Sequence, residues 1–161
     1  MKRIFRELHN LDKDPHPDVR VYPSEENSLF WNLLFKGPEG TPYSGYIFQA
    51  YATFPDEYPR QPPIFRFITP IYHCNINNDG RICHSIFDRN YSPSVTIREI
   101  MNHIFALLMT PEPKDPLDNK RAQEFFSNRD IYNSNVRKCC ETYAFSSIAQ
   151  AEDLLLGKDQ I

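Results

Sequence analysis

Cys83 and Asn75 are the two residues of this chain whose types and spacing most directly suggest a reaction. They lie eight positions apart in the stretch Tyr-His-Cys-Asn-Ile-Asn-Asn-Asp-Gly-Arg-Ile-Cys-His-Ser-Ile-Phe, which covers residues 72–87, and Cys83 closely follows an Asn-Asp-Gly turn. A thiol can carry an acyl group as a covalent intermediate, and a nearby side-chain amide can stabilise the oxyanion of acyl transfer. The pattern therefore indicates acyl transfer through a cysteine.

The other cysteines bear on whether a thiol is free to react. The chain has four cysteines: Cys74, Cys83, Cys139 and Cys140. Nothing else is typical of a secreted, disulfide-stapled domain, and adjacent cysteines rarely bridge to each other, so we expect reduced thiols. His73-Cys74 and Cys83-His84 could suggest zinc, but they lack the usual two close ligand pairs. We therefore expect no metal site.

Composition and charge limit the classes of function. The 161 residues suffice for one domain, and 40% of them are hydrophobic, which is enough for one buried core. The net charge of −3 lacks the basic excess of a nucleic-acid-binding surface. No apolar run approaches the ~20 residues that span a bilayer, and no long apolar stretch follows the basic N-terminus as in a secretory signal. We expect no nucleic-acid or membrane partner, and a cytoplasmic or nuclear location, or both.

The elements that must position the cysteine begin with a helix and a group of strands. Apolar residues spaced by three and four positions predict a helix over 2–13. Runs rich in aromatic and branched residues predict strands over 29–35, 46–54 and 64–68, which form an antiparallel meander. Residues 69–96 show no clear periodicity and form a long loop, a kind of segment that is usually functional in a compact domain.

Further helices are predicted after this loop. Thr96-Ile97-Arg98-Glu99 has the pattern of a capping box, and it begins a helix whose apolar residues are Ile97, Ile100, Met101, Ile104, Leu107 and Leu108. Residues 119–128 and 130–145 predict two more helices. Residues 149–156 predict a short amphipathic helix whose leucines, Leu154, Leu155 and Leu156, need cover. Because strands and helices are segregated along the chain, the fold class is α+β, with the central helix packed across the sheet.

The stretch around Cys83 resembles the active-site signature of ubiquitin-conjugating enzymes, which usually reads His-Pro-Asn, then a turn with Gly, then a hydrophobic residue and the catalytic Cys. The matching residues are His73, Cys74, Asn75, Gly80, Ile82 and Cys83. Only the proline is replaced, by Cys74, which we interpret as a small packed residue. Other blocks keep the family's order across roughly residues 2–145, among them Gly37-Pro38, Pro42-Tyr43-Ser44-Gly45, Tyr58-Pro59-Arg60-Gln61-Pro62-Pro63 and Pro111-Glu112-Pro113-Lys114-Asp115-Pro116-Leu117.

This resemblance implies a fold with an N-terminal helix, a four-stranded antiparallel meander, a long active-site loop, a central helix and C-terminal helices. Residues 1–145 would be the catalytic core, and 146–161 a short C-terminal extension that we expect to be helical. The implied activity begins with an ATP-dependent activating enzyme, which passes ubiquitin to Cys83 as a thioester. Ubiquitin then goes to a substrate lysine with the help of a RING or other ligase, and no cofactor is needed in this chain.

Two alternatives to ubiquitin conjugation stay open. The chain could carry a ubiquitin-like modifier of the NEDD8 or SUMO type. It could also be a noncatalytic ubiquitin-binding variant of the same fold, although such variants lack the cysteine. A charging reaction with each modifier would separate these alternatives.

The resemblance also implies roles for single residues. Cys83 is the expected nucleophile, and Asn75 either stabilises the oxyanion or holds the loop in shape. Asp115 matches the acidic residue that positions the acceptor lysine and helps it lose a proton. Three residues of the surrounding loop are expected to support the site: His73, Ser85 and Asp88. Of these, Ser85 occupies a position that is acidic in some members, and Asp88 could partly substitute for the missing carboxylate.

A contact surface for the activating enzyme and the ligase is implied as well. Its expected residues are Lys2, Arg3, Arg6, Pro59, Arg60, Ser92 and Pro93. Many members carry an apolar residue that ligases grip at the position of Arg60, so we expect unusual ligase choice. Arg20 is expected on the outer face of the sheet, where some members bind a second ubiquitin and where a long cation could weaken that contact. We expect the protein to be a monomer.

Overall fold

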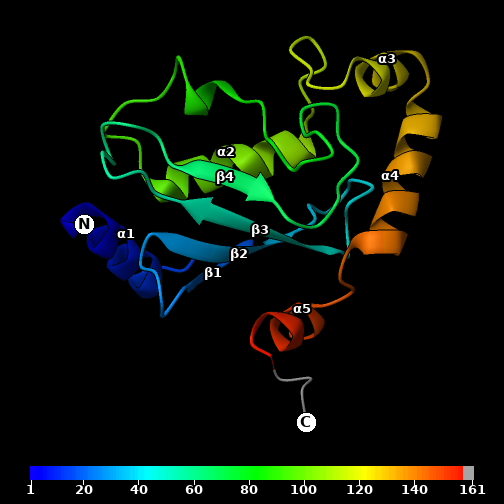
Figure 1. Ribbon diagram of the computed structural model, residues 1–161. Coiled ribbons are helices and arrows are strands. Elements are labelled where there is room, and N and C mark those ends of the chain that lie inside the picture. The colour runs from blue at the N-terminus through cyan, green and yellow to red at the C-terminus, as the bar shows by residue number, and fades with distance from the viewer. Residues whose placement is uncertain (158–161) are drawn as a thin grey trace.

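The computed structural model describes residues 1–157 and contains a four-stranded sheet (Figure 1). Its strands are β1 (Val19–Pro23), β2 (Phe30–Lys36), β3 (Ile47–Thr53) and β4 (Ile64–Phe67), and they lie in this order with every neighbouring pair antiparallel. The α+β class and the predicted meander are therefore confirmed. The sequence pattern does not locate β1, because this strand is short, ends in a proline and buries only Val19.

The core lies between one face of the sheet and the helix α2 (Ile97–Met109). The core-facing side chains of β2 are completely buried: Trp31, Leu33 and Phe35. All six apolar residues of the predicted helical stripe in α2 are buried in the same cluster, and each such side chain stabilises the fold by about 1.5–3 kcal/mol. The capping box is confirmed, since the Thr96 hydroxyl accepts from the Glu99 N–H (3.1 Å) and the Glu99 carboxylate accepts from the Thr96 N–H (2.7 Å).

The helix α1 (Lys2–Lys13) is joined to α2 by a buried carboxylate. Of the apolar residues that predict α1, Ile4 and Leu11 are buried in the core and Leu8 packs against it, but Phe5 is 52% exposed. Glu7 lies beside them, 5% exposed, and accepts hydrogen bonds from the Ile97 N–H (2.7 Å) and from the Tyr58 hydroxyl. Because the N-terminus of a helix attracts negative charge, Glu7 fixes α1 against the start of α2.

Two further helices, α3 (Asn119–Ser127) and α4 (Arg129–Tyr143), lie at the end of the molecule remote from α1 (Figure 1). Their predicted positions are confirmed to within two residues. Asp118 caps α3 by accepting from the Arg121 N–H (2.9 Å), and Asn128 caps α4 by accepting from the Ile131 N–H (3.2 Å). This end of the molecule lies beside the active-site loop.

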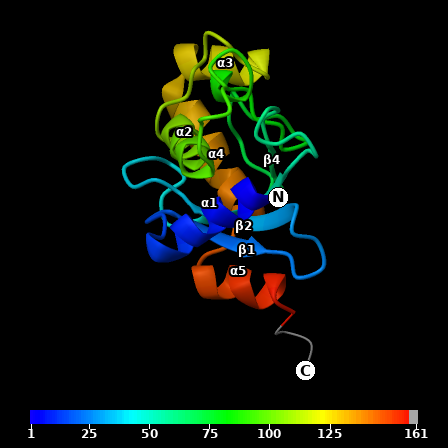
Figure 2. The same ribbon diagram turned by 90° about the vertical axis from the view of Figure 1, so that its left-hand side faces the viewer.

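A short helix, α5 (Ile148–Leu155), lies on the face of the sheet opposite the core (Figures 1 and 2). Its Ala151 is 1% exposed and forms a second apolar cluster with Leu34 and Ile47. The predicted helix is confirmed, but the predicted cover of its leucines is wrong for Leu154 and Leu156, whose exposed fractions are 61% and 51%. The reason is that this small helix turns only one stripe toward the sheet. The rest of the predicted extension, residues 158–161, lies outside the described residues.

Arg20 is on this outer face, as expected, where its guanidinium lies 3.0 Å from the Glu152 carboxylate of α5. The Tyr22 hydroxyl donates to the same carboxylate. The C-terminal helix is thus attached to β1 by polar contacts and to β2 and β3 by the apolar cluster.

Candidate active site

A glycine turn after β4 places Cys83 beside Asn75. Gly80 has φ of 78°, and a Cβ built on it would lie 1.9 Å from the Phe67 carbonyl oxygen, so only glycine fits. The Asn77 side chain accepts from the Asp79 and Arg81 N–H groups, each at 3.0 Å, and shapes the turn. The chain then returns, and the Cys83 N–H donates to the Asn75 carbonyl (2.9 Å).

The Cys83 thiol is partly exposed, and its pKa is raised. Burial is the main cause, and the carboxylates of Asp115 and Asp88 add to it, while the Arg81 guanidinium opposes them. Burial also lowers the pKa of the neighbouring His84, so this ring contributes no full positive charge near neutral pH. Cys83 is therefore mostly a thiol at neutral pH.

The buried side chain of Asn75 holds the loop that contains Asp115. Its amide nitrogen donates to the carbonyls of Glu112 (2.8 Å) and Asp115 (3.0 Å), and its oxygen accepts from the Glu112 N–H (2.8 Å). Both amide hydrogens are used in these bonds. This arrangement favours the loop-holding alternative, because an oxyanion role requires one hydrogen to leave its carbonyl.

His73 links the active-site loop to α2. The ring is completely buried; its Nε2 donates to the Leu107 carbonyl (2.8 Å) and its Nδ1 accepts from the Asn75 N–H (3.0 Å). Burial lowers the pKa of His73 from 6.5 to about 4, so the ring is neutral at pH 7. These bonds fit the supporting role expected for this histidine.

Cys74 is completely buried and ties the loop to α4 and to the start of α3. Its N–H donates to the Tyr132 hydroxyl (3.3 Å), and its carbonyl accepts from the N–H groups of Leu117 (2.9 Å) and Asp118 (3.2 Å). A proline has no N–H, so the bond to Tyr132 exists because cysteine replaces it. Burial raises the pKa of Cys74 to about 11, which suits a packed thiol.

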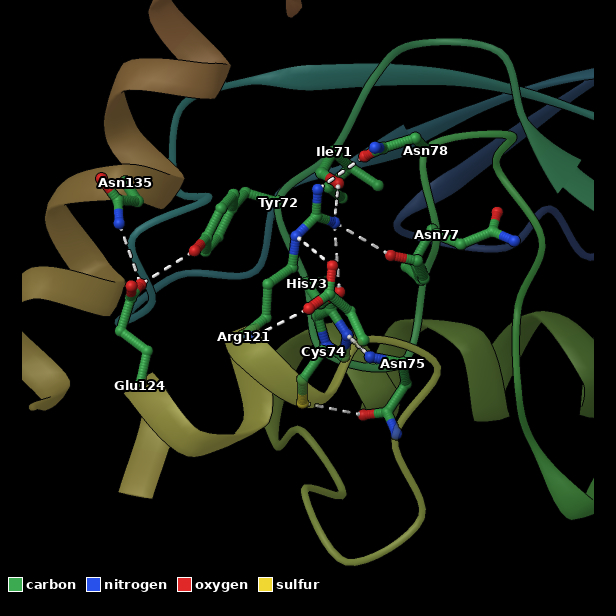
Figure 3. A network of polar contacts seen from close by, with 12 residues as sticks. Ile71, Tyr72, His73, Cys74, Asn75, Asn77, Asn78, Arg121, Glu124 and Asn135 are labelled. Atoms are coloured by element: carbon green, nitrogen blue, oxygen red, sulfur yellow. Dashed lines mark hydrogen bonds and ion pairs between the residues drawn. The ribbon is translucent and has the colours of Figure 1, made fainter. Parts of the chain in front are cut away.

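Arg121, at the start of α3, organises the same loop and was not marked by any sequence motif (Figure 3). Its guanidinium donates to the Ile76 carbonyl (3.1 Å) and the Asn78 side chain (2.6 Å), and it lies 3.3 Å from the Asp118 carboxylate. It also covers the ring of Tyr72, 4.4 Å from the centroid. Arg121 thus provides hydrogen-bond donors for carbonyls of the 71–76 segment and fixes the part of the chain that leads to Cys83.

The other expected site residues lie around the opening. The exposed Asp115 carboxylate is 3.9 Å from the guanidinium of Arg89, a residue that sequence reasoning missed because it belongs to no motif. Ser85 begins a short 3₁₀ turn, Ser85–Phe87, and its hydroxyl accepts from the Asn90 amide (2.7 Å). Asp88 follows this turn and is exposed. Asp88 and Asp115 thus place two carboxylates near Cys83.

The expected partner surface combines α1 with two loops. The Arg3 guanidinium donates to the carbonyls of Pro93 (2.7 Å) and Val95 (2.9 Å), so this cation joins α1 to the loop before α2. The Tyr91 hydroxyl donates to the Pro59 carbonyl (2.6 Å) and joins the two loops. The expected residues that stay exposed are Lys2, Arg6, Arg60, Ser92 and Pro93.

Within residues 1–157, no three His, Cys, Asp or Glu side chains gather closely enough to hold a metal ion. No helix in this part of the chain is both long and apolar enough to cross a membrane. All four cysteines are free thiols. The groups around Cys83 that can take part in a reaction are its thiol, the Asn75 amide, the His84 imidazole, carboxylates and guanidinium groups.

A four-stranded meander packed on a central helix, with a partly exposed cysteine after a glycine turn and a buried asparagine behind it, defines the class of ubiquitin-conjugating enzymes. The family profile described as "Ubiquitin-conjugating enzyme" matches residues 3–140. The chain belongs to this family.

Three relatives extend the comparison. The sequence is 43% identical over 145 residues to a probable bifunctional E2/E3 enzyme of Acanthamoeba polyphaga mimivirus, which covers 90% of this chain but only 11% of the viral protein. It is 38% identical over 143 residues to the ubiquitin-conjugating enzyme E2 13 of Schizosaccharomyces pombe, covering 89% of this chain and 97% of that protein. The Saccharomyces cerevisiae enzyme of the same name is also 38% identical over 143 residues, covering 89% of this chain and 94% of its own.

Proposed function

We propose that this chain carries ubiquitin as a thioester on Cys83 and delivers it to a lysine of a substrate protein. The observation that carries the proposal is the placement of Cys83: a partly exposed thiol, tied through its N–H to Asn75, whose side chain holds the Asp115 loop. Membership of the ubiquitin-conjugating enzyme family supports it. No metal or organic cofactor is required, because the thioester arrives already activated.

Two exchanges at one carbonyl carbon make up the reaction. In the first, the Cys83 thiolate attacks the thioester on the activating enzyme; a new C–S bond forms, and the activating enzyme's sulfur leaves and takes up a proton. In the second, the neutral lysine amine attacks the Cys83 thioester; a C–N bond forms, the C–S bond breaks, Cys83 leaves as thiolate, and the nitrogen gives up one proton to water or to that thiolate. The raised pKa of Cys83 means that the proton must leave this thiol during the first encounter.

The second exchange needs a neutral amine, whereas a lysine with a pKa of about 10.4 is mostly protonated at pH 7. Asp115 and Asp88 lie close enough to Cys83 to raise the pKa of its thiol, so their carboxylates can attract and orient a lysine cation that approaches the thioester. We propose that Asp115 has this role and that Asp88 assists it, while Ser85 contributes no charge. Asn75 holds the Asp115 backbone at the required position.

A charging reaction tests this function. The protein is mixed with ubiquitin, a ubiquitin-activating enzyme and ATP, and the products are separated on a non-reducing gel. We expect an adduct that thiol reagents cleave, that is absent in Cys83→Ala and that persists in the buried-thiol control Cys74→Ala. Cys83→Ser should give an ester that resists thiols and is cleaved by hydroxide.

Other results would select the alternatives. An adduct formed only with a NEDD8- or SUMO-type modifier and its own activating enzyme would change the cargo and keep the chemistry. No adduct with any of these modifiers, beside a working control enzyme, would contradict a carrier function. It would leave the noncatalytic ubiquitin-binding role.

We also propose that the activating enzyme and a ligase contact the exposed cations of α1 and the neighbouring loop, Lys2, Arg6 and Arg60. Arg3 acts differently, by holding Pro93 in place. Arg6→Glu should slow charging, because this reversal opposes the attraction of an acidic partner. Arg137→Glu, on the exposed surface of α4, is the matched control. Equal charging rates for the two variants would contradict the role of Arg6.

The proposed reaction also bears on the oligomeric state and the cellular location of the protein. We propose that it works as a monomer in the cytoplasm, the nucleus or both, where thiols stay reduced and activated ubiquitin is supplied. Sedimentation of the full chain at working concentration tests the monomer. Imaging of a fluorescent fusion tests the location.

A further inference from the structure

A groove opens beside Cys83 on the side away from the Asp115 loop. Its volume is about 430 Å³, and its lining residues come from the segment leading into β4, from the turn before Cys83 and from the 3₁₀ turn after it. The groove walls are largely apolar: Pro62, Pro63, Ile64, Phe65, Ile82 and Phe87. None of the lining residues comes from residues 112–118, so the loop that Asn75 holds forms no wall of this groove.

Two arginines face this groove, and they are neighbours across strands. Arg66 of β4 and Arg81 of the turn form an isolated antiparallel bridge, which places them side by side beside the thiol. Within residues 1–157 neither guanidinium has a hydrogen-bond or ion-pair partner. Asp88 is the one carboxylate among the lining residues, and it lies after the 3₁₀ turn, where it accepts from the Arg89 N–H.

The groove therefore carries two guanidinium groups and one carboxylate, whereas the neighbouring loop contributes the carboxylates of Glu112 and Asp115. Asp115, Asp88 and Glu112 lie close enough to raise the pKa of the thiol, and Arg81, in the groove, lowers it. A lysine that approaches the thioester is drawn toward the carboxylates. A carboxylate close to that lysine in the same substrate is drawn toward the two arginines.

We propose that Arg66 and Arg81 form a substrate subsite that receives an acidic side chain lying near the acceptor lysine. The substrate class is a protein segment with Asp or Glu within a few residues of the modified lysine. This inference rests on the proposed function, since it concerns the second exchange at Cys83. It assigns the two arginines to substrate choice and not to loading.

Paired peptides test the subsite. The Cys83–ubiquitin thioester is formed first, the ATP is removed, and peptides with one lysine are added at pH 8. The two peptides of a pair differ only in having Glu or Gln at one position. Different pairs place this position at different distances before and after the lysine. We expect one Glu peptide to discharge the thioester about fivefold faster than its Gln partner, and the preference should shrink as salt is added.

The double variant Arg66→Gln/Arg81→Gln should lose the preference, so that the Glu and Gln peptides react at equal rates. Because the ratio is taken within one variant, changes in the reactivity of Cys83 cancel. Arg137→Gln removes an exposed cation on α4, outside the groove, and should keep the wild-type ratio. A wild-type ratio near one at every position, or a ratio that survives in the double variant, would overturn the subsite.

Binding without reaction gives a second readout. The same peptides are titrated into ¹⁵N-labelled full-length protein, and the preferred Glu peptide should shift the amide signals of Arg66 and Arg81 more than its Gln partner does. Failure of the subsite differs from failure of the proposed function. If Cys83 is loaded and discharges to free lysine but shows no peptide preference, only the subsite is contradicted. If no thioester forms at all, the proposed function is contradicted.

Discussion

Asn75 has both hydrogens of its side-chain amide on carbonyls of the loop that follows α2, at Glu112 and Asp115. Replacing it by alanine removes three hydrogen bonds to this loop and the bond that its oxygen accepts from the Cys74 thiol, and it leaves partly buried backbone groups without partners. We expect Asn75→Ala to lower the free energy of unfolding by about 2–3 kcal/mol and to speed amide exchange at Glu112. Denaturant unfolding and hydrogen exchange measure the two effects, and Asn119→Ala, an exposed asparagine at the start of α3, is the control.

The opposite result would favour an oxyanion donor. If Asn75→Ala slowed discharge to lysine by about two orders of magnitude while stability and exchange stayed at wild-type values, the amide would act mainly on the reaction. If Asn75→Ala both disordered the loop and slowed discharge, Asn75 would act on the reaction by positioning Asp115.

The carboxylate of Asp115 acts on two groups in opposite directions. It raises the pKa of Cys83, and in the proposed reaction it helps the lysine lose a proton. Asp115→Asn should therefore lower the pKa of Cys83 and speed its alkylation at a fixed pH near 8, while it slows discharge of the thioester to lysine. The pH dependence of iodoacetamide labelling and a single-turnover discharge assay measure both rates.

The control for Asp115 is Glu141→Gln, which removes an exposed carboxylate from α4 and should change neither rate. Alkylation that is unchanged or slower in Asp115→Asn would show that this carboxylate does not act on the thiol. Discharge at the wild-type rate would contradict its role toward the lysine.

At the scale of elements, the sequence predicts whatever depends on local periodicity. The stripe of α2, the cap formed by Thr96 and Glu99, and the strands β2 to β4 are examples, because alternating or helical burial leaves a mark in the chain itself. β1 leaves little mark, since only Val19 is buried. The exposed Leu154 shows a related limit: an amphipathic pattern shows which residues are apolar but not how many a receiving surface covers.

The reacting residues of the site could be predicted from the sequence, but the contacts that position them could not. The type and spacing of Cys83, Asn75 and Gly80 indicate the reaction, but the contacts of Asn75 are with backbone groups 37 and 40 residues away, and no side-chain pattern records them. Arg121 is similar, since four of its hydrogen bonds go to the 71–78 segment. Contacts of this kind depend on tertiary structure, so they appear only when the chain is folded.

The attachment of α5 gives a prediction at this scale. Ala151 is the buried contact of the helix with Leu34 and Ile47, so Ala151→Asp places an unpaired carboxylate in an apolar cluster. We expect α5 to detach from the sheet and become sensitive to protease, while the main core and the charging of Cys83 are kept. Ala149→Asp, at an exposed position of the same helix, is the control.

Limited proteolysis with mass detection, together with the charging assay, measures the outcome. An α5 that stays protected in Ala151→Asp would contradict the attachment through this cluster. Global unfolding of the variant would show that the outer face and the main core are a single cooperative unit.

At the scale of the whole molecule, stability depends on pH through a buried imidazole. His73 joins the active-site loop to α2, and burial lowers its pKa from 6.5 to about 4. Between these values the unfolded chain binds a proton that the folded chain does not, so stability is full above pH 6.5, falls as the pH decreases and levels off near pH 4. Protonation of this histidine alone is expected to lower the free energy of unfolding by about 2 kcal/mol between pH 7 and pH 5.

His73→Gln tests this linkage because glutamine does not titrate. The variant should be less stable than the wild type at pH 7, since one side chain cannot keep both ring bonds, but the difference should narrow by about 2 kcal/mol at pH 5. His84→Gln is the comparison, because the pKa of His84 is also lowered but its ring is only partly buried, so its contribution is smaller. Denaturant unfolding at both pH values measures the differences. Parallel pH curves for the wild type and His73→Gln would mean that the imidazole takes up its proton without unfolding the loop, and that acid sensitivity arises elsewhere in the molecule.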